Sequence, residues 1–160
     1  MIGLICLGNP FHADDGFGTA VHRRLSGCPW PDEIRLHDGG EGGILNLLRH
    51  CRQAILISSL ASHLGFPGQM MRLAADQIPA DPQGPLGTGP ASVLSSMRRV
   101  LADPPTVELL GAVALHQRPF SNGLSPKVAA AVETASAMVW REFGRARKGS
   151  AKPVPEISTL

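Results

Sequence analysis

The chain has 160 residues, 43% of them hydrophobic, and a formal net charge of +2. This length can bury one core of ordinary size, so we expect one domain. No run approaches the roughly 20 apolar residues of a membrane-spanning helix. The small net charge, without basic residues interleaved with aromatics, disfavours nucleic-acid binding.

The cysteines and the first residues indicate a cytoplasmic location. Cys6, Cys28 and Cys51 are odd in number and lack the paired spacing of a metal site. Such a set is typical of reduced thiols. Met1 leads straight into an apolar run with no basic segment before it, so we expect no signal peptide.

The first expected elements are a strand, a turn and a helix. The apolar run Leu4–Leu7 is typical of a strand buried on both faces. Gly8-Asn9-Pro10 ends it, because glycine tolerates unusual dihedral angles and proline has no N–H to donate. Asp14 and Asp15 follow, and we expect Asp14 to cap the next helix. That helix has an apolar stripe formed by Phe17, Ala20, Val21 and Leu25.

Further strands and helices alternate along the chain. We expect strands at 33–38, near a sheet edge, at 54–57, central and fully apolar, and at 68–73 and 107–115. Helices are expected at 43–51, 91–101 and 126–143, the last capped by Ser125 with Pro126 at its first position. Loops are expected at 58–67 and in the proline- and glycine-rich segment 76–90, and a polar tail at 145–160 follows a domain at 1–144.

This alternation predicts an α/β fold with a mostly parallel five-stranded sheet and helices on both faces. Ligands of such sheets bind beyond the carboxyl ends of the strands. Several polar residues follow expected strand ends and are predicted to line one rim: Asp15, Asp38, Ser58, Ser59 and His116.

Each of these residues also has an ordinary structural interpretation. Asp38 before Gly39-Gly40 is as typical of a turn as of a substrate contact. His12 is interpreted as a solvated loop side chain. A serine nucleophile at Ser58 or Ser59 would need His63 or His116 as its base, and we disfavour this hypothesis. The cysteines have no acid or base nearby in the sequence, so a cysteine nucleophile is also disfavoured. The glycine spacing does not match a nucleotide-binding loop.

Four glycine-bearing segments resemble the hydrogenase maturation proteases in order and spacing. They are Gly8-Asn9-Pro10 with Asp14-Asp15-Gly16-Phe17-Gly18, Asp38-Gly39-Gly40, Pro67-Gly68, and Gly123-Leu124-Ser125-Pro126. The resemblance covers most of residues 3–140. It implies a three-layer, doubly wound fold and a cytoplasmic endopeptidase, monomeric before it binds substrate, that removes a C-terminal extension from the large subunit of a nickel–iron hydrogenase.

The resemblance also implies three metal-binding positions that engage the nickel of the precursor, with no tightly bound cofactor. The first is an acid and matches Asp15. The second is an aspartate in the family, but Ser59, or alternatively Ser58, stands there. The third is a histidine in the family, and Leu86 stands there. His63 and His116 are the candidates to rebuild the site beside Asp15.

Two functional hypotheses follow. In the first, the chain is a metal-dependent endopeptidase in which Asp15 holds the metal while Asp38, Gly39 and Gly40 position the precursor's C-terminal segment. In the second, the chain does not cut but binds a hydrogenase subunit or maturation factor as a chaperone or checkpoint, because serine and leucine are poor substitutes for metal ligands.

Overall fold

The computed structural model describes residues 1–81 and 88–145. The strands are β1 (Ile2–Cys6), β2 (Ile34–Asp38), β3 (Gln53–Leu60), β4 (Met70–Ala74) and β5 (Thr106–Val113). The helices are α1 (Phe17–Leu25), α2 (Ile44–Arg49), α3 (Pro90–Val100) and α4 (Pro126–Val139), which continues as a π-helical segment, Trp140–Arg145. Leu86 and nearly all of the predicted tail lie outside the described residues.

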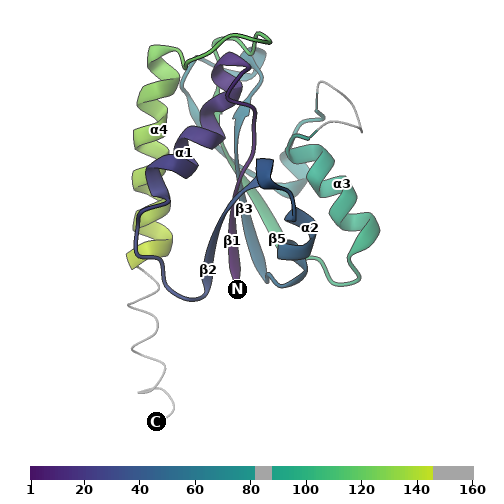
Figure 1. Cartoon of the computed structure of the whole chain (residues 1–160). Helices are drawn as coiled ribbons and strands as arrows, with labels where there is room; N and C mark the ends of the chain where they lie inside the picture. Colours follow the sequence, from purple (N-terminus) through teal and green to yellow (C-terminus); the bar gives the residue numbers. More distant parts are fainter. Residues whose placement is uncertain (82–87, 146–160) are drawn as a thin grey trace.

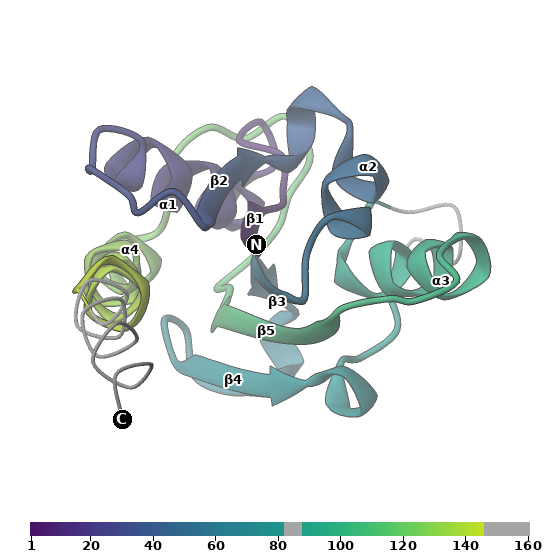
Figure 2. The same ribbon diagram turned by 90° about the horizontal axis from the view of Figure 1, so that it is seen from below.

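The strands form one sheet in the order β2-β1-β3-β5-β4. All neighbouring pairs are parallel except β4 and β5, which are antiparallel. Helices α1 and α4 cover one face of the sheet, and α2 and α3 cover the other (Figures 1 and 2). The predicted α/β class, the edge position of β2 and the central position of β3 are confirmed.

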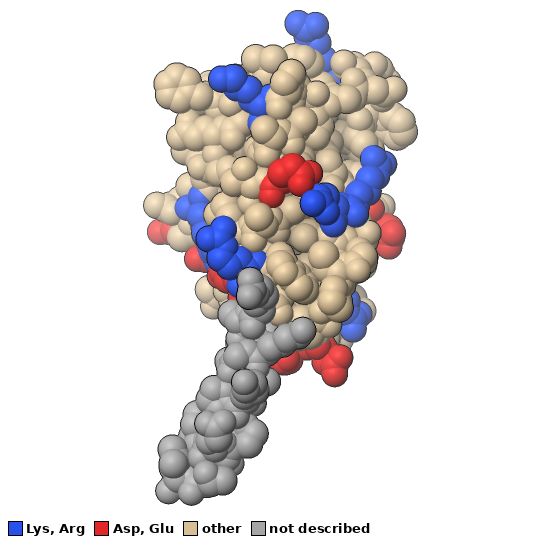
Figure 3. All heavy atoms as spheres, turned by 90° about the vertical axis from the view of Figure 1, so that its left-hand side faces the viewer, with Lys and Arg blue, Asp and Glu red and all other residues tan. Residues whose placement is uncertain are grey.

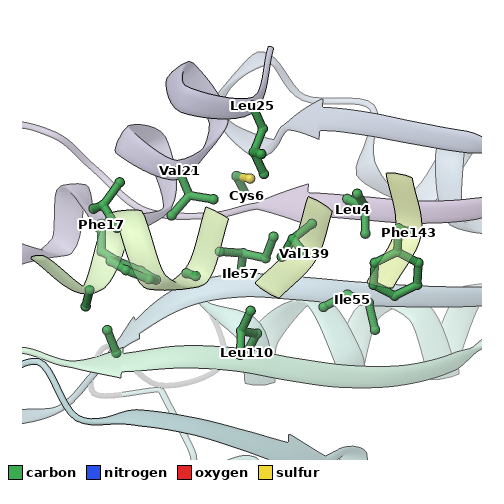
Figure 4. Close-up of a cluster of buried hydrophobic side chains, with 14 of the residues drawn as sticks. Leu4, Cys6, Phe17, Val21, Leu25, Ile55, Ile57, Leu110, Val139 and Phe143 are labelled. Carbon is green, nitrogen blue, oxygen red and sulfur yellow. The ribbon is translucent and has the colours of Figure 1, made fainter. Parts of the chain in front are cut away.

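Two hydrophobic cores sit on opposite faces of the sheet, because side chains alternate along each strand. Leu4 and Cys6 of β1 belong to the core under α1 and α4, whereas Ile5 between them belongs to the other. Figure 4 shows the first core, in which Phe17 and Val139 meet the side chains of the central strands. All five residues of β1 are buried, as the continuous apolar run predicts.

Helix α1 begins directly against the ends of the central strands. A Cβ at Gly18 would lie 2.1 Å from the carbonyl oxygen of Leu7 and 2.8 Å from that of Ile57. Only glycine permits this approach, so the start of α1 is held at the carboxyl edge of the sheet. The acids that precede α1 are thereby placed at this edge.

The expected loop at 58–67 is wrong at its start. Strand β3 continues to Leu60, and Ser58 and Ser59 pair with Gly111 and Ala112 of β5. Both serines are buried. Hydroxyl groups at the end of an apolar run look like the beginning of a loop, but strand pairing is made by the backbone and does not require apolar side chains.

The surface over α1 and α4 has no concentrated charge. Figure 3 shows this side, where the acidic and basic side chains are scattered among uncharged ones. An exposed ion pair between Arg24 and Glu133 joins the two helices, a contact usually worth about 0–1 kcal/mol. Within residues 1–81 and 88–145, no helix has the length and apolar character needed to cross a membrane.

Candidate active site at the carboxyl edge of the sheet

The loop after β1 folds back on itself and fixes the position of Asp15. The amide of Asn9 donates to the backbone carbonyl of Asp15 at 3.1 Å and to its Oδ2 at 3.0 Å. Gly8 adopts φ +136, and a Cβ there would lie 2.1 Å from the Asp15 carbonyl oxygen. Glycine is therefore required by both the backbone conformation and the close approach.

Asp15 belongs to a chain of hydrogen bonds that joins three elements. Ser59 Oγ, near the end of β3, donates to Asp15 Oδ1 at 3.0 Å. Gln117 Nε2, in the segment after β5, donates to Ser59 Oγ at 2.8 Å. Both carboxylate oxygens of Asp15 thus have donors, and the structure brings Asp15 and Ser59, two of the residues predicted to line one rim, together.

Burial raises the pKa of Asp15 above its ordinary value. The hydrogen bonds from Ser59 and Asn9, and the nearby His12, act in the opposite direction. Desolvation disfavours the charged form, whereas donors and positive charge favour it. Asp15 is therefore a partly desolvated carboxyl group held in a fixed geometry, as expected of a group that interacts with a ligand.

A cavity of about 650 Å³ opens beside Asp15. Asp15, Ser58, Ser59, His12, His63 and Gln117 are among its lining residues. This volume lies within the range of ordinary ligand pockets. The position fits the rule for parallel sheets, since the cavity lies where β1 and β3 end.

The predicted rim residues divide into two groups. Ser58 and Ser59 share the cavity with Asp15, whereas Asp38 and His116, both within the described residues, do not line it. His63, a candidate to rebuild the metal site, also lines this cavity. His12, which we interpreted as solvated, lines the cavity, and its ring lies edge-on to that of Phe120 with centroids 6.1 Å apart.

The described part of the chain contains no group of three or more His, Cys, Asp or Glu side chains arranged to hold a metal ion. Completion of a site by His63 or His116 stays a prediction. The position of Leu86 lies outside the described residues. On the described side chains, Asp15 offers one carboxylate and Ser59 one neutral hydroxyl, a donor set that transition-metal ions bind weakly.

Asp14 is not the cap of α1. Gly16 occupies that position without a side-chain hydrogen bond, because Asp14 lies within the short 3-10 turn Ala13–Gly16. Its fully buried carboxylate accepts from the amide of Leu115 at 2.8 Å, and from the amide and hydroxyl of Ser125 at 2.7 and 2.9 Å. Asp14 therefore ties the end of β5 and the start of α4 to the loop that carries Asp15.

Ser125 precedes α4 as predicted, but its hydroxyl donates to Asp14 and makes no capping bond within the helix. Asp38 forms an ordinary turn, in which its Oδ1 accepts from the amide of Gly40 at 3.0 Å. Gly39 and Gly40 line a second cavity beside the first. A contact between these residues and substrate stays a prediction.

Two polar residues of this edge escaped the sequence argument. Gln117 lies just beyond the expected strand 107–115, and this position after a strand end was the only sequence signal that pointed to it. Asp81 accepts from the amides of Ala91 and Ser92 and so caps α3 from ten residues upstream. A cap so distant along the chain has no local sequence signature.

Comparison with known proteins identifies a relative of the chain by sequence. The chain is 31% identical over 144 residues to the hydrogenase expression/formation protein HupD of Rhodobacter capsulatus, covering 86% of this chain and 68% of that protein. No model of a protein family matches the chain.

Two solved structures from Escherichia coli are similar over the same region. The hydrogenase maturating endopeptidase HybD matches with a TM-score of 0.70 and 26% identity, covering 88% of this chain and 92% of that one. An endopeptidase solved in solution matches with a TM-score of 0.74 and 28% identity, with the same coverage. By sequence and fold, the chain belongs to the hydrogenase maturation protease family.

Proposed function

We propose that this chain removes the C-terminal extension from the large-subunit precursor of a nickel–iron hydrogenase. The observation that carries the proposal is the Asp15 carboxylate, held at the carboxyl edge of the sheet in a cavity large enough for a peptide segment. Similarity to HupD and to the endopeptidase HybD supports the same role.

In this proposal, nickel arrives as part of the substrate. Asp15 and Ser59 form too small a donor set for a strong metal site of their own, so the ion would keep most of its ligands from the precursor. Asp15 would add one carboxylate oxygen to it. A metal ion placed beside the scissile carbonyl polarises that bond and favours attack by water. Nickel-loaded precursor is then preferred because it brings the missing ligands.

The orientation of Asp15 is already set before substrate arrives. Its Oδ2 is held by Asn9 and its Oδ1 by Ser59, which is itself held by Gln117. A preorganised carboxylate needs little rearrangement to meet an incoming ion. The Ser59 bond would weaken or rotate away when Oδ1 binds the metal.

A second candidate function is binding of the precursor without cleavage, as a chaperone or checkpoint. The specific observation in its favour is the pair of hydrogen bonds by which Gln117 donates to Ser59 and Ser59 donates to Asp15. These hydrogen bonds supply the Asp15 carboxylate with a neutral donor, Ser59, at the position where the family resemblance implies a second acid. The protein could then still bind the precursor although it lacks the second acid needed to hold a metal ion.

Incubation of the purified protein with nickel-loaded large-subunit precursor separates the two functions. Cleavage seen as a mobility shift, and lost in Asp15→Asn, supports the endopeptidase. Stable association without a shift supports the non-cutting role. Gln117→Glu is a useful companion variant, since it removes the donor to Ser59 while leaving Asp15 in place.

A further inference from the structure

A second cavity of about 640 Å³ lies beside the candidate active site. The two cavities share Gly8, Asn9 and Thr88 in their linings. The second is lined by the loop after β1, the glycine turn after β2, and helices α2 and α3. It therefore adjoins the cavity of Asp15, and two of the elements that line it, α2 and α3, cover one face of the sheet (Figure 1).

The two cavities differ in chemical character. The first contains the ionisable side chains of Asp15, Asp81, His12 and His63. The described lining of the second contains no charged residue, and its larger side chains are apolar: Leu7, Pro10, Phe11, Ile44, Leu45 and Val93. Phe11 is 62% exposed at its margin. Such a surface favours uncharged, apolar groups, because a buried charge would find no partner there.

Asn9 lines both cavities, and its position is fixed by hydrogen bonds within the candidate active site. Asn9 donates its amide to Asp15 and accepts from the amide of Phe11 through its side chain at 2.9 Å. The glycine turn forms the opposite wall, where Gly40 is held by Asp38 and Gly42 donates to the carbonyl of Gly39. A chain segment that passes Asn9 would thus cross from a charged cavity into an apolar one along fixed walls.

We propose that the second cavity is a specificity subsite that holds an apolar side chain of the precursor's C-terminal segment while the bond to be cut lies beside Asp15. This inference rests on the proposed function and adds the residue class that the segment must present. An extended chain advances about 3.3–3.6 Å per residue, so two neighbouring cavities correspond to positions a few residues apart. The same subsite would serve recognition whether or not cleavage follows.

Filling the cavity from α3 tests the proposal. Ser96 lines the cavity and is half-buried, whereas its neighbour Ser95 is exposed and does not line it. Ser96→Trp should weaken binding of the large-subunit precursor by about tenfold or more, the value of one buried apolar side chain, while Ser95→Trp should bind as the wild type does. Circular dichroism melting should give similar curves for both variants.

A second measurement uses the wild-type protein and changes the precursor instead. Each apolar residue within a few positions of the cleavage junction of the precursor is replaced in turn by aspartate, and binding to the wild-type protein is measured. At least one replacement should weaken binding by about tenfold or more, because the residues known to line the subsite within 1–81 and 88–145 include no partner for the new charge.

The outcomes distinguish a failure of the subsite proposal from a failure of the proposed function. Equal binding by the wild type, Ser96→Trp and Ser95→Trp, with a flat aspartate scan, overturns the subsite and leaves the proposed function standing. If none of the three proteins binds the precursor, both proposals are overturned.

Discussion

Asp14→Asn should destabilise the protein far more than its small chemical change suggests. The Asp14 carboxylate is fully buried and accepts hydrogen bonds only from N–H and O–H donors of Leu115, His116 and Ser125. An asparagine must turn its NH₂ group toward one of these donors. Whichever way it turns, at least one backbone amide loses its acceptor.

The magnitude follows from these bonds. A buried unpaired N–H costs about 1–3 kcal/mol, and hydrogen bonds to a charged acceptor are worth about 1.5–3 kcal/mol compared with roughly 1 kcal/mol for neutral ones. The sum is a loss of about 3 kcal/mol from a total that is typically about 5–15 kcal/mol for a small domain. Urea unfolding followed by circular dichroism measures it, with the exposed Asp32→Asn as control.

Hydrogen exchange adds a site-specific check. The amides of Leu115 and Ser125 should exchange faster in Asp14→Asn, because both donate to Asp14 in the wild type. A loss of free energy below about 1 kcal/mol, together with unchanged exchange at both amides, would refute the reasoning.

Three further variants test the loop and the acid. Asp15→Asn should be more stable than the wild type at about pH 7 but little different at about pH 4. The pKa of Asp15 is raised in the folded state, so the wild type loses folding free energy as the pH rises above the ordinary aspartate value, and the loss is complete above the folded-state value. Denaturation at both pH values measures this, and a difference that stays constant would contradict the reasoning. Gly8→Ala should lose at least about 2 kcal/mol, whereas Gly27→Ala, with nothing within 4 Å of its Cβ, should lose little; equal melting temperatures would contradict the clash. Ser59→Asp should destabilise the metal-free protein by placing a second carboxylate beside Asp15, and Cd²⁺ should restore the melting temperature; a destabilisation that Cd²⁺ leaves unchanged would speak against metal binding at this edge.

Much of the fold follows from hydrophobic periodicity. The fully apolar run at 54–57 predicts a central strand, and β3 is indeed central. The same criterion ends the strand too early, because Ser58 and Ser59 are polar although they remain in the ladder opposite Gly111 and Ala112. Periodicity detects burial of side chains, whereas the length of a strand also depends on what lies across from it.

The site was predictable where it depends on register and not where it depends on distant loops. Asp15 follows β1 and Ser59 lies near the end of the neighbouring β3, so their position at one rim could be predicted. Asp14 looks like a helix cap because capping rules consider only nearby amides, but its donors lie 101 to 111 residues later in the chain. Gln117 donates to Ser59 from the irregular segment after β5, whose conformation hydrophobic periodicity does not predict.

The central claim is that Asp15 acts on a nickel-bearing precursor, and the intact mass of the large subunit tests it most directly. After incubation with the wild-type protein, nickel-loaded precursor should lose the mass of its C-terminal extension. Nickel-free precursor should keep its full mass, as should nickel-loaded precursor incubated with Asp15→Asn. Equal cleavage by the wild type and Asp15→Asn, or no cleavage of nickel-loaded precursor by the wild type, would contradict the account.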